Sequence, residues 1–481
     1  MYATIKKSPY IRWFILINVA LGSFMATLDS SIVNVALPTM TQEFHTNLTS
    51  IQWVVTAYLI VIASLLPIFG RLADIIGRRR VYLAGILIFL IGSALCGQAY
   101  SISFLVGMRV IQAIGASMLM ANSQALIISA FPAHERGRAL GLNSTIVALG
   151  TLTGPVLGGL LVGQLGWRSI FYINIPLGIL AYLVAFVILP VDPRKEKISK
   201  SDYPGTILFF LGLSILLYSV SNGQEIGWKS SVILGGIFTG LVLLIFFIIV
   251  ERRTSDPMIN LGLYSIKPFR RGNSSSFLSF AGQYAYIILM PFYLQGILNY
   301  SVAQTGLILM VPPLMMAMIA PISGYYSDKM EPAILPTIGL LTMACGFFYF
   351  STITSYTLFI GIIPGSILLG FGTGMFNSPN NNRIMGCVPQ AELGVAGGLN
   401  ALVRNLGMVV GTVYSVSLFK TCQTFILAKL VNPSADQQIE AFMTAFHIVM
   451  IVSGMILLSA SIISYSYKKF QKNILNAFFG K

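Results

Sequence analysis

The chain has 481 residues, of which 56% are hydrophobic and 9% are charged, and its mean hydropathy is +0.80. These values exclude an ordinary water-soluble protein, and a net charge of +15 without a clustered basic face gives no support to nucleic-acid binding. The four cysteines have neither paired nor metal-like spacing, which argues against both disulfides and a zinc site.

Long apolar runs predict an all-helical membrane protein. In a bilayer only helices and closed barrels pair every backbone group, and runs of about 20 apolar residues select helices. We expect about fourteen, at 13–38, 52–70, 81–99, 103–127, 139–163, 168–190, 204–222, 230–251, 273–297, 304–326, 333–352, 356–380, 395–418 and 442–466. The first is interpreted as a retained helix rather than a signal peptide. The segment 419–441 is the longest predicted external loop.

The distribution of Lys and Arg predicts how these helices are oriented. Placing the N-terminus in the cytoplasm puts most of the 30 Lys and Arg residues in cytoplasmic segments, as the positive-inside rule requires. An even number of helices then leaves both termini in the cytoplasm. We expect a multi-pass protein of the cell membrane, whose basic composition needs no polyanionic partner.

The two ends of the chain repeat each other. Gly70 and Asp74 recur as Gly324 and Asp328 with the same spacing. Two parallel repeats of six helices leave two helices over, near 204–251. The predicted parts are an N-terminal six-helix half at 1–200, a two-helix insert at 201–255 and a C-terminal six-helix half at 256–481.

Ionisable residues inside the predicted helices are the first candidates for function, since lipid makes each of them costly. Asp29 in the first helix is the one carboxylate that we place well inside a helix, and we favour a proton-binding role over a structural anchor. Arg109 in the fourth helix would tune a neighbouring acid, or would pin helices together through carbonyl groups. Gln112 is expected on a similar face. Arg404 could face a cavity or serve only helix contacts, and its role stays open.

A glycine and an aspartate mark the loop between the second and third helices. Gly70 would admit another backbone closely, Asp74 could cap a helix end, and Arg78 would anchor the cytoplasmic edge. Because the pair recurs as Gly324 and Asp328, we favour a contact that stabilises one conformation over ordinary topology-determining arginines.

The fifth predicted helix contains Gly154, Pro155 and Gly158. These residues are poor helix formers, which favours tight helix contact, a kink or both, with generic glycine-rich contact as the plainer interpretation. No Lys-Ser/Thr pair follows, so the segment is not typical of a phosphate-binding loop.

Aromatic and amide side chains could line an adaptable substrate pocket, although most such residues face lipid or other helices. The expected substrate contacts are Phe24, Asn34, Tyr58, Gln112, Tyr284, Tyr286 and Gln295. No Ser-His-Asp set, metal-ligand cluster or nucleotide loop is evident in the sequence, so we expect neither an enzyme nor a cofactor.

Several motifs resemble the major facilitator superfamily, and within it the fourteen-helix drug:proton antiporters. The run GRLADIIGRRR resembles the superfamily's loop between helices two and three. LDSSIVNVALP, RVIQAIGAS, GTLTGPVLGG and GWRSIFYINIPLG resemble motifs of helices one, four, five and six in those antiporters. The resemblance covers nearly the whole chain and implies six plus two plus six helices, with two pseudo-two-fold halves that give alternating access to a central cavity.

The resemblance also implies a function. A lipophilic compound would leave in exchange for protons, with Asp29 as the coupling residue, Arg109 supporting proton transfer and Asp74 stabilising one gating state. With Arg404, the intramembrane charges leave one net positive charge, so we expect neutral, zwitterionic or monocationic substrates rather than dications. The expected partners are a small molecule, protons and membrane lipids, and the expected state is a monomer.

Two other functions stay open at this stage. One is a dedicated proton-coupled transporter of a single metabolite, such as an amino acid or an organic anion, for which two intramembrane arginines would be useful. The other is a receptor or scaffold without flux, which would have no need of costly buried charges.

Overall fold

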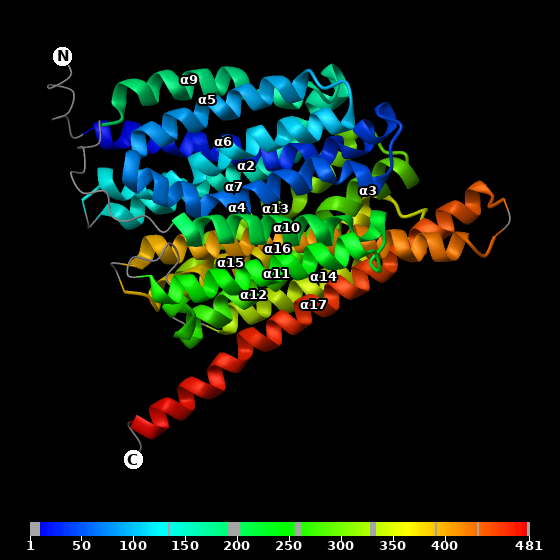
Figure 1. The fold of residues 1–481 in the computed structure, drawn as a ribbon. Helices are drawn as coiled ribbons and strands as arrows, with labels where there is room; N and C mark the ends of the chain where they lie inside the picture. The colour runs from blue at the N-terminus through cyan, green and yellow to red at the C-terminus, as the bar shows by residue number, and fades with distance from the viewer. Residues whose placement is uncertain are drawn as a thin grey trace. The chain divides into compact units, whose positions relative to one another are not determined.

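The computed structural model describes residues 10–132, 135–190, 203–254, 261–327, 333–389, 392–430 and 432–478, and these are almost entirely helical (Figure 1). The main helices are α2 (Ile11–Glu43), α4 (Trp53–Ile76), α5 (Arg78–Gly97), α6 (Ile102–Ala130), α7 (Arg136–Leu165), α9 (Asn174–Ile188), α10 (Tyr203–Ile226), α11 (Ser231–Arg253), α12 (Lys267–Phe292), α13 (Val302–Ser327), α14 (Ile334–Phe350), α15 (Phe359–Gly386), α16 (Leu393–Leu427) and α17 (Ala435–Phe478). Shorter pieces are α3 (Leu48–Ile51), α8 (Ser169–Tyr172), the 3₁₀ turn η2 (Leu261–Ser265) and the π turn η3 (Tyr293–Ile297).

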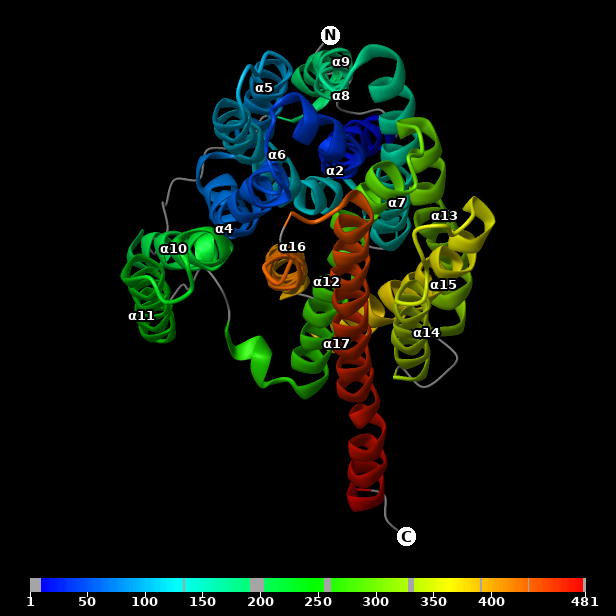
Figure 2. The same cartoon turned by 90° about the vertical axis from the view of Figure 1, so that its right-hand side faces the viewer.

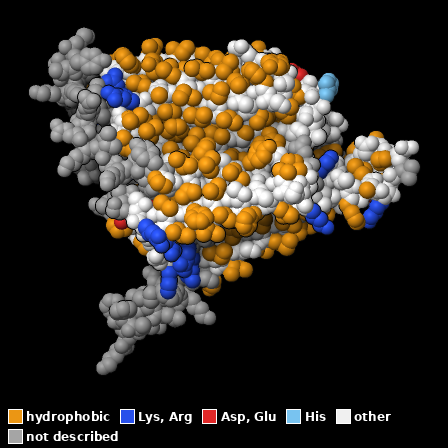
Figure 3. Space-filling model, viewed as in Figure 1, with side chains coloured by type: hydrophobic (Ala, Val, Ile, Leu, Met, Phe, Trp, Pro, Cys, Tyr) orange, Lys and Arg blue, Asp and Glu red, His pale blue; other side chains and the backbone are white. Residues whose placement is uncertain are grey.

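Twelve of the described helices are long and apolar enough to cross a membrane, and two shorter apolar segments lie at Leu149–Leu165 and Ile334–Phe350. Large apolar side chains also lie on the outside, as on α11, where Phe238 is 69% exposed. Hydrophobic side chains cover the visible face along the helices, whereas Lys and Arg gather towards the helix ends (Figure 3). Such a surface is stable in lipid, and the chain is a multi-pass membrane protein, as predicted.

The chain forms two compact units, Met1–Asn260 and Leu261–Lys481. In the first unit, α2 contacts α6, α7 and α9, α5 contacts α6 and α9, and α4 contacts α6. Helix α10 pairs with α11 and also contacts α4, and the labels of these helices can be followed in Figure 2. The α10–α11 pair is therefore additional to a bundle of six.

The second unit repeats the same set of contacts with different residues. Helix α12 contacts α15, α16 and α17, α14 contacts α15 and α17, and α13 contacts α15. These pairs match those of α2, α5 and α4 in the first unit one for one. The six plus two plus six arrangement is thus confirmed, while the predicted part boundaries at 200 and 255 stay a prediction.

Glycines bring the repeated helix pairs into close contact. A Cβ added to Gly92 in α5 would lie 2.6 Å from the Gln112 backbone in α6. In the second unit a Cβ on Gly339 of α14 would lie 2.6 Å from the carbonyl oxygen of Gly372 in α15. Without a side chain at these points the backbones approach each other directly, which is how helices associate where water supplies no hydrophobic driving force.

The predicted helix ends were wrong at several places. Helix α16 continues to Leu427 and α17 begins at Ala435, so most of the predicted external loop at 419–441 is helical. The sixth predicted helix is divided into α8 and α9 at Ile173. In each case hydropathy predicts the extent of the apolar run. The hydrogen-bonded helix ends or breaks at other residues.

Candidate functional site

Asp29 is the centre of a buried polar network in the first unit. Its Oδ2 accepts a hydrogen bond from Arg109 Nη1 at 2.5 Å, and its Oδ1 accepts from Gln112 Nε2 at 2.8 Å and from Asn174 Nδ2 at 3.0 Å. The Asp29 residue is 0% exposed and Arg109 is 1% exposed. Three donors from α6 and α9 therefore converge on one carboxylate of α2, an arrangement that suits its ionised form.

Arg109 has several partners in addition to Asp29. Its Nε donates to the carbonyl oxygen of Val54 in α4 at 3.0 Å, and its Nη1 donates to Gln112 Oε1 at 2.6 Å. The guanidinium carbon lies 4.0 Å from the ring centroid of Tyr58 and 5.8 Å from that of Phe171. The charge is thus stabilised by an acid, an amide, a carbonyl and two aromatic rings.

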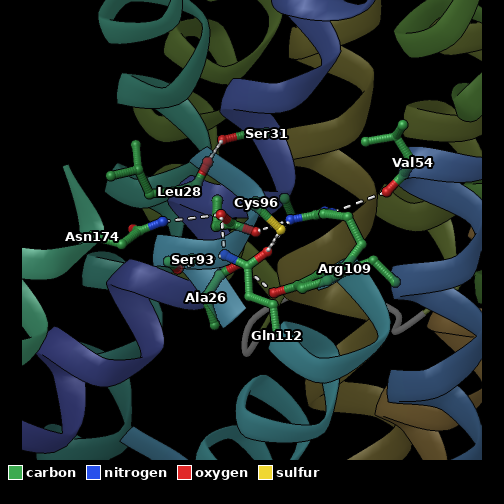
Figure 4. Close-up of polar contacts among 12 residues, drawn as sticks. Ala26, Leu28, Ser31, Val54, Ser93, Cys96, Arg109, Gln112 and Asn174 are labelled. Carbon is green, nitrogen blue, oxygen red and sulfur yellow. Dashed lines mark hydrogen bonds and ion pairs between the residues drawn. The ribbon is translucent and has the colours of Figure 1, made fainter. Parts of the chain in front are cut away.

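Gln112 connects the ion pair to α5 (Figure 4). Its Nε2 donates to Ser93 Oγ at 2.7 Å as well as to Asp29, and its Oε1 accepts from Arg109 and lies 3.8 Å from Cys96 Sγ. All of these side chains are buried. Since both ends of the amide are used, its orientation is fixed, and α2, α4, α5, α6 and α9 meet at one polar junction.

A second polar contact holds the ends of these helices. Glu43 at the end of α2 accepts from Trp167 Nε1 at 2.7 Å and from Arg168 Nη1 at 2.6 Å. Arg168 also donates to the carbonyl oxygen of Ala99, after α5, at 3.0 Å. The turn before Trp167 passes through Gly166 at φ +79°, where glycine is favoured. This contact fixes the start of α8, a few residues before Asn174.

The fifth-helix motif packs against the segment of α2 that carries Asp29. A Cβ on Gly154 would clash with the Ser31 side chain, and one on Gly158 would lie 3.0 Å from Ile32 Cγ1. Ser31 Oγ donates to the carbonyl oxygen of Gly150 at 3.3 Å. Pro155 lies inside the continuous helix α7. The expected tight helix contact is confirmed, and it packs α7 against α2, the helix that carries Asp29.

The residues expected to contact substrate are divided between the two units. In the first unit Tyr58 and Gln112 are inaccessible in this conformation, Phe24 is half-buried, and the Asn34 amide donates back to the Ser30 carbonyl of its own helix at 3.2 Å. In the second, Tyr284 and Tyr286 are buried and Gln295 is half-buried in the π turn. Their role as substrate contacts stays a prediction.

The expected gating residues give a mixed result. Arg78 donates to the Ala125 carbonyl oxygen at 3.2 Å and so connects the start of α5 to α6. A Cβ on Gly324 would lie 2.8 Å from Ser378 Oγ of α15. A Cβ on Gly70 meets no described atom within 4 Å, and the expected close approach of another backbone stays a prediction. The side chain of Asp74 and the residue Asp328 lie outside the described part of the chain.

The second unit has a neutral cluster on the helices that correspond to α2 and α6. Gln283 Oε1 of α12 accepts from Thr373 Oγ1 of α15 at 3.1 Å, and Gln283 Nε2 donates to Ser279 Oγ at 2.9 Å. Arg404, the second predicted intramembrane cation, lies on α16 with its guanidinium carbon 5.9 Å from the Phe280 ring centroid. It therefore belongs to a different unit from Asp29 and is not part of the buried network.

Sequence reasoning found Asp29, Arg109 and Gln112 but missed Asn174, Ser93 and Cys96. Asn174 was visible as an amide in an apolar run, directly after Ile173, where α8 gives way to α9. The sequence predicted one continuous helix at 168–190, so nothing indicated that this amide would reach Asp29. Ser93 and Cys96 are small side chains that apolar helices commonly contain, so no signal distinguished them.

A family model described as the Major Facilitator Superfamily matches residues 19–204 and 204–412. The chain belongs to this superfamily. The fourteen main helices among the described residues, together with the motifs, agree with the drug:proton antiporters within the superfamily, as the sequence resemblance predicted. The chain is therefore a transporter by family, with a small molecule as the expected substrate class.

Named relatives agree with this assignment. The chain is 36% identical to the riboflavin transporter RibZ of Clostridioides difficile (strain 630), over 86% of this chain and 90% of that protein. It is 34% identical to the multidrug resistance protein Stp of Mycobacterium tuberculosis, over 82% of this chain and 74% of that protein. A crystal structure of an auto-inhibited POT family peptide transporter, 15% identical, has a TM-score of 0.70 over 96% of this chain and 97% of that one, which supports the fold alone.

Proposed function

We propose that this protein exports lipophilic small molecules from the cell in exchange for protons, with Asp29 as the proton-binding residue. The observation that carries the proposal is the fully buried carboxylate held by Arg109, Gln112 and Asn174. Such a costly group at membrane depth is a strong candidate for ion coupling. The name of the relative associated with multidrug resistance supports the choice of substrate class.

Protonation of Asp29 would change the balance of conformations in a definite direction. The ionised carboxylate connects α2 to α6 and α9 through one charged and two neutral donors. A proton on the carboxylate removes its charge, so the ion pair with Arg109 is lost and the junction weakens. The proton therefore favours a conformation in which α2 and α6 are less tightly joined.

Access to Asp29 must alternate in this scheme. At 0% exposure the carboxylate cannot exchange a proton with water in the conformation described here. A shift of α2, α6 or α9 is required before the proton enters or leaves, which couples proton transfer to a conformational change. Each proton that moves inward contributes roughly 2.3 kcal/mol per 100 mV of membrane potential, in addition to its pH gradient.

Charge suggests which compounds are exported. Helix α13 has no acidic residue, and Arg404 adds a cation to the second unit. A protein with this balance stabilises two substrate charges poorly, so neutral, zwitterionic and monocationic compounds are favoured. The transporter is expected to act as a monomer in the cell membrane, in contact with lipid, with both termini in the cytoplasm and without nucleic acid, a cofactor or a chemical step.

A dedicated transporter of one metabolite is the second candidate. The specific observation in its favour is the 36% identity to a protein named as a riboflavin transporter. A panel of unrelated dyes and of single metabolites, tested in competition, separates the two functions, because a dedicated transporter responds to one chemical class only.

Reconstituted protein in liposomes that contain a pH-sensitive dye tests the proposal. We expect several unrelated compounds to trigger proton flux in the wild type and in Asp436→Asn, which makes the same chemical change at an exposed acid in α17. Asp29→Asn should abolish the flux. Flux with one metabolite only would favour the dedicated transporter, and flux that survives Asp29→Asn would exclude Asp29 as the coupling residue.

A further inference from the structure

The two intramembrane arginines have opposite surroundings. Arg109 donates to a carboxylate, an amide and a carbonyl oxygen. Arg404 has a buried Nε without a hydrogen-bond partner, and no residue that the structure describes forms an ion pair or hydrogen bond with it. Its neighbours on α12 are two aromatic side chains, the Phe280 ring and Tyr284. An arginine that served only helix contact would hold backbone carbonyls, as Arg109 holds Val54.

The position of Arg404 decides what its guanidinium faces. Arg404 follows the start of α16 at Leu393 by about three turns, which is roughly 17 Å along the helix and inside the apolar span Val395–Leu427. The side chain is partly exposed. Lipid tails are a prohibitive neighbour for a charge at this depth, so a guanidinium without a hydrogen-bond partner among the described residues requires water or a polar ligand.

Helix periodicity gives the direction of the side chain. Gly407 and Gly411 lie one and two turns further along α16. A Cβ added at Gly407 would lie 2.6 Å from the carbonyl oxygen of Phe277 in α12, and one added at Gly411 would lie 2.5 Å from that of Ala281. Residues spaced three and four apart share a helix face, so Arg404 lies on the side of α16 that meets α12. The 5.9 Å separation from Phe280, also of α12, agrees with this direction.

A guanidinium with unused donors beside an aromatic face selects a definite kind of ligand. The planar fork of arginine matches a carboxylate in a bidentate manner. A phenylalanine ring offers a surface on which a flat ligand ring stacks. We propose that Arg404 and Phe280 form a substrate subsite that receives a planar aromatic compound through its carboxylate. This subsite rests on the proposed transport function and narrows its substrate class towards zwitterionic aromatic acids.

A matched pair of fluorescent dyes tests the subsite. The probes are a zwitterionic rhodamine with a free carboxylate and its methyl ester, which share the ring system and differ in the anionic oxygen. Fluorescence polarisation with purified full-length protein in detergent measures the Kd of each dye without any need for flux. The variants are Arg404→Gln and Phe280→Leu, and the control Lys429→Gln removes an exposed cation that lies 4.2 Å from the Phe425 ring.

We expect the wild type and Lys429→Gln to bind the acid about tenfold more tightly than the ester, in line with one charge-assisted hydrogen-bonded pair. Arg404→Gln should abolish this preference by weakening the binding of the acid alone. Phe280→Leu should weaken the binding of both dyes. Equal binding of the two dyes by the wild type, no binding of either, or a parallel loss of both in Arg404→Gln would overturn the subsite. Proton flux, measured separately, tests the transport function, so the two failures are distinguishable.

Discussion

Removal of the Asp29–Arg109 ion pair is expected to have a large and separable effect on stability. Breaking a buried pair by removing one partner costs about 3–5 kcal/mol, since the other charge stays buried. We expect Asp29→Asn to lower the free energy of unfolding by about 3 kcal/mol, the lower end of this range. The asparagine is isosteric, and the guanidinium keeps its bonds to the Val54 carbonyl and to Gln112.

Arg109→Gln is expected to lower the free energy of unfolding by more, about 4–5 kcal/mol. It leaves the Asp29 carboxylate buried with only amide donors, and it also removes the bond to Val54 and the 4.0 Å contact with the Tyr58 ring. The double variant Asp29→Asn/Arg109→Gln contains no buried charge at this junction. Its loss of unfolding free energy should therefore be smaller than the sum of the single losses by about 2–3 kcal/mol.

The cycle can be measured by unfolding in mixed micelles. Addition of an anionic detergent to protein in a mild one, followed by far-UV circular dichroism, reports the loss of helix and gives the free energy of unfolding. A control cycle between Asp29→Asn and the exposed Lys429→Gln should be additive. Additivity of the Asp29 and Arg109 changes to within about 0.5 kcal/mol would refute direct coupling of the two charges.

Two further predictions concern neighbours of this junction. Gly154→Ala should lower both thermal stability and flux, because the new methyl group would clash with Ser31 on α2. The control Gly163→Ala should be neutral in the same thermal melts, because no described atom lies within 4 Å of its Cβ. Asn174→Leu should lower the free energy of unfolding by about 1.5–3 kcal/mol, the value of a hydrogen bond to a charged group, and an unchanged value would show that the bond to Asp29 contributes nothing.

The sequence predicted which charged residues lie inside apolar helices better than it predicted the partners of those residues. Asp29 and Arg109 were found because a charged residue within an apolar run is energetically costly, and such a residue is visible in the local sequence. The Glu43–Trp167 contact joins residues far apart in the chain, and neither residue is unusual where it stands. Long-range pairing of ordinary residues leaves no mark on a single sequence.

Glycine motifs show the same limit. Gly154 and Gly158 predicted a tight helix contact, which was confirmed, but not that α2 would be the partner helix. Gly70 also predicted a close approach, but no described atom lies within 4 Å of its Cβ position, because a missing side chain indicates room without showing what fills it. Helix number followed from hydropathy, whereas the extension of α16 to Leu427 required the hydrogen-bonded backbone itself.

The two units repeat one set of helix contacts but not one set of charges. Where α2 and α6 meet through Asp29 and Arg109, the corresponding α12 and α15 meet through the neutral pair Gln283 and Thr373. A duplicated scaffold of this kind separates two evolutionary constraints. Under the proposed function, substitutions in the second unit would alter which compounds are recognised without disturbing the buried ion pair, so specificity could change while the response to protons is kept.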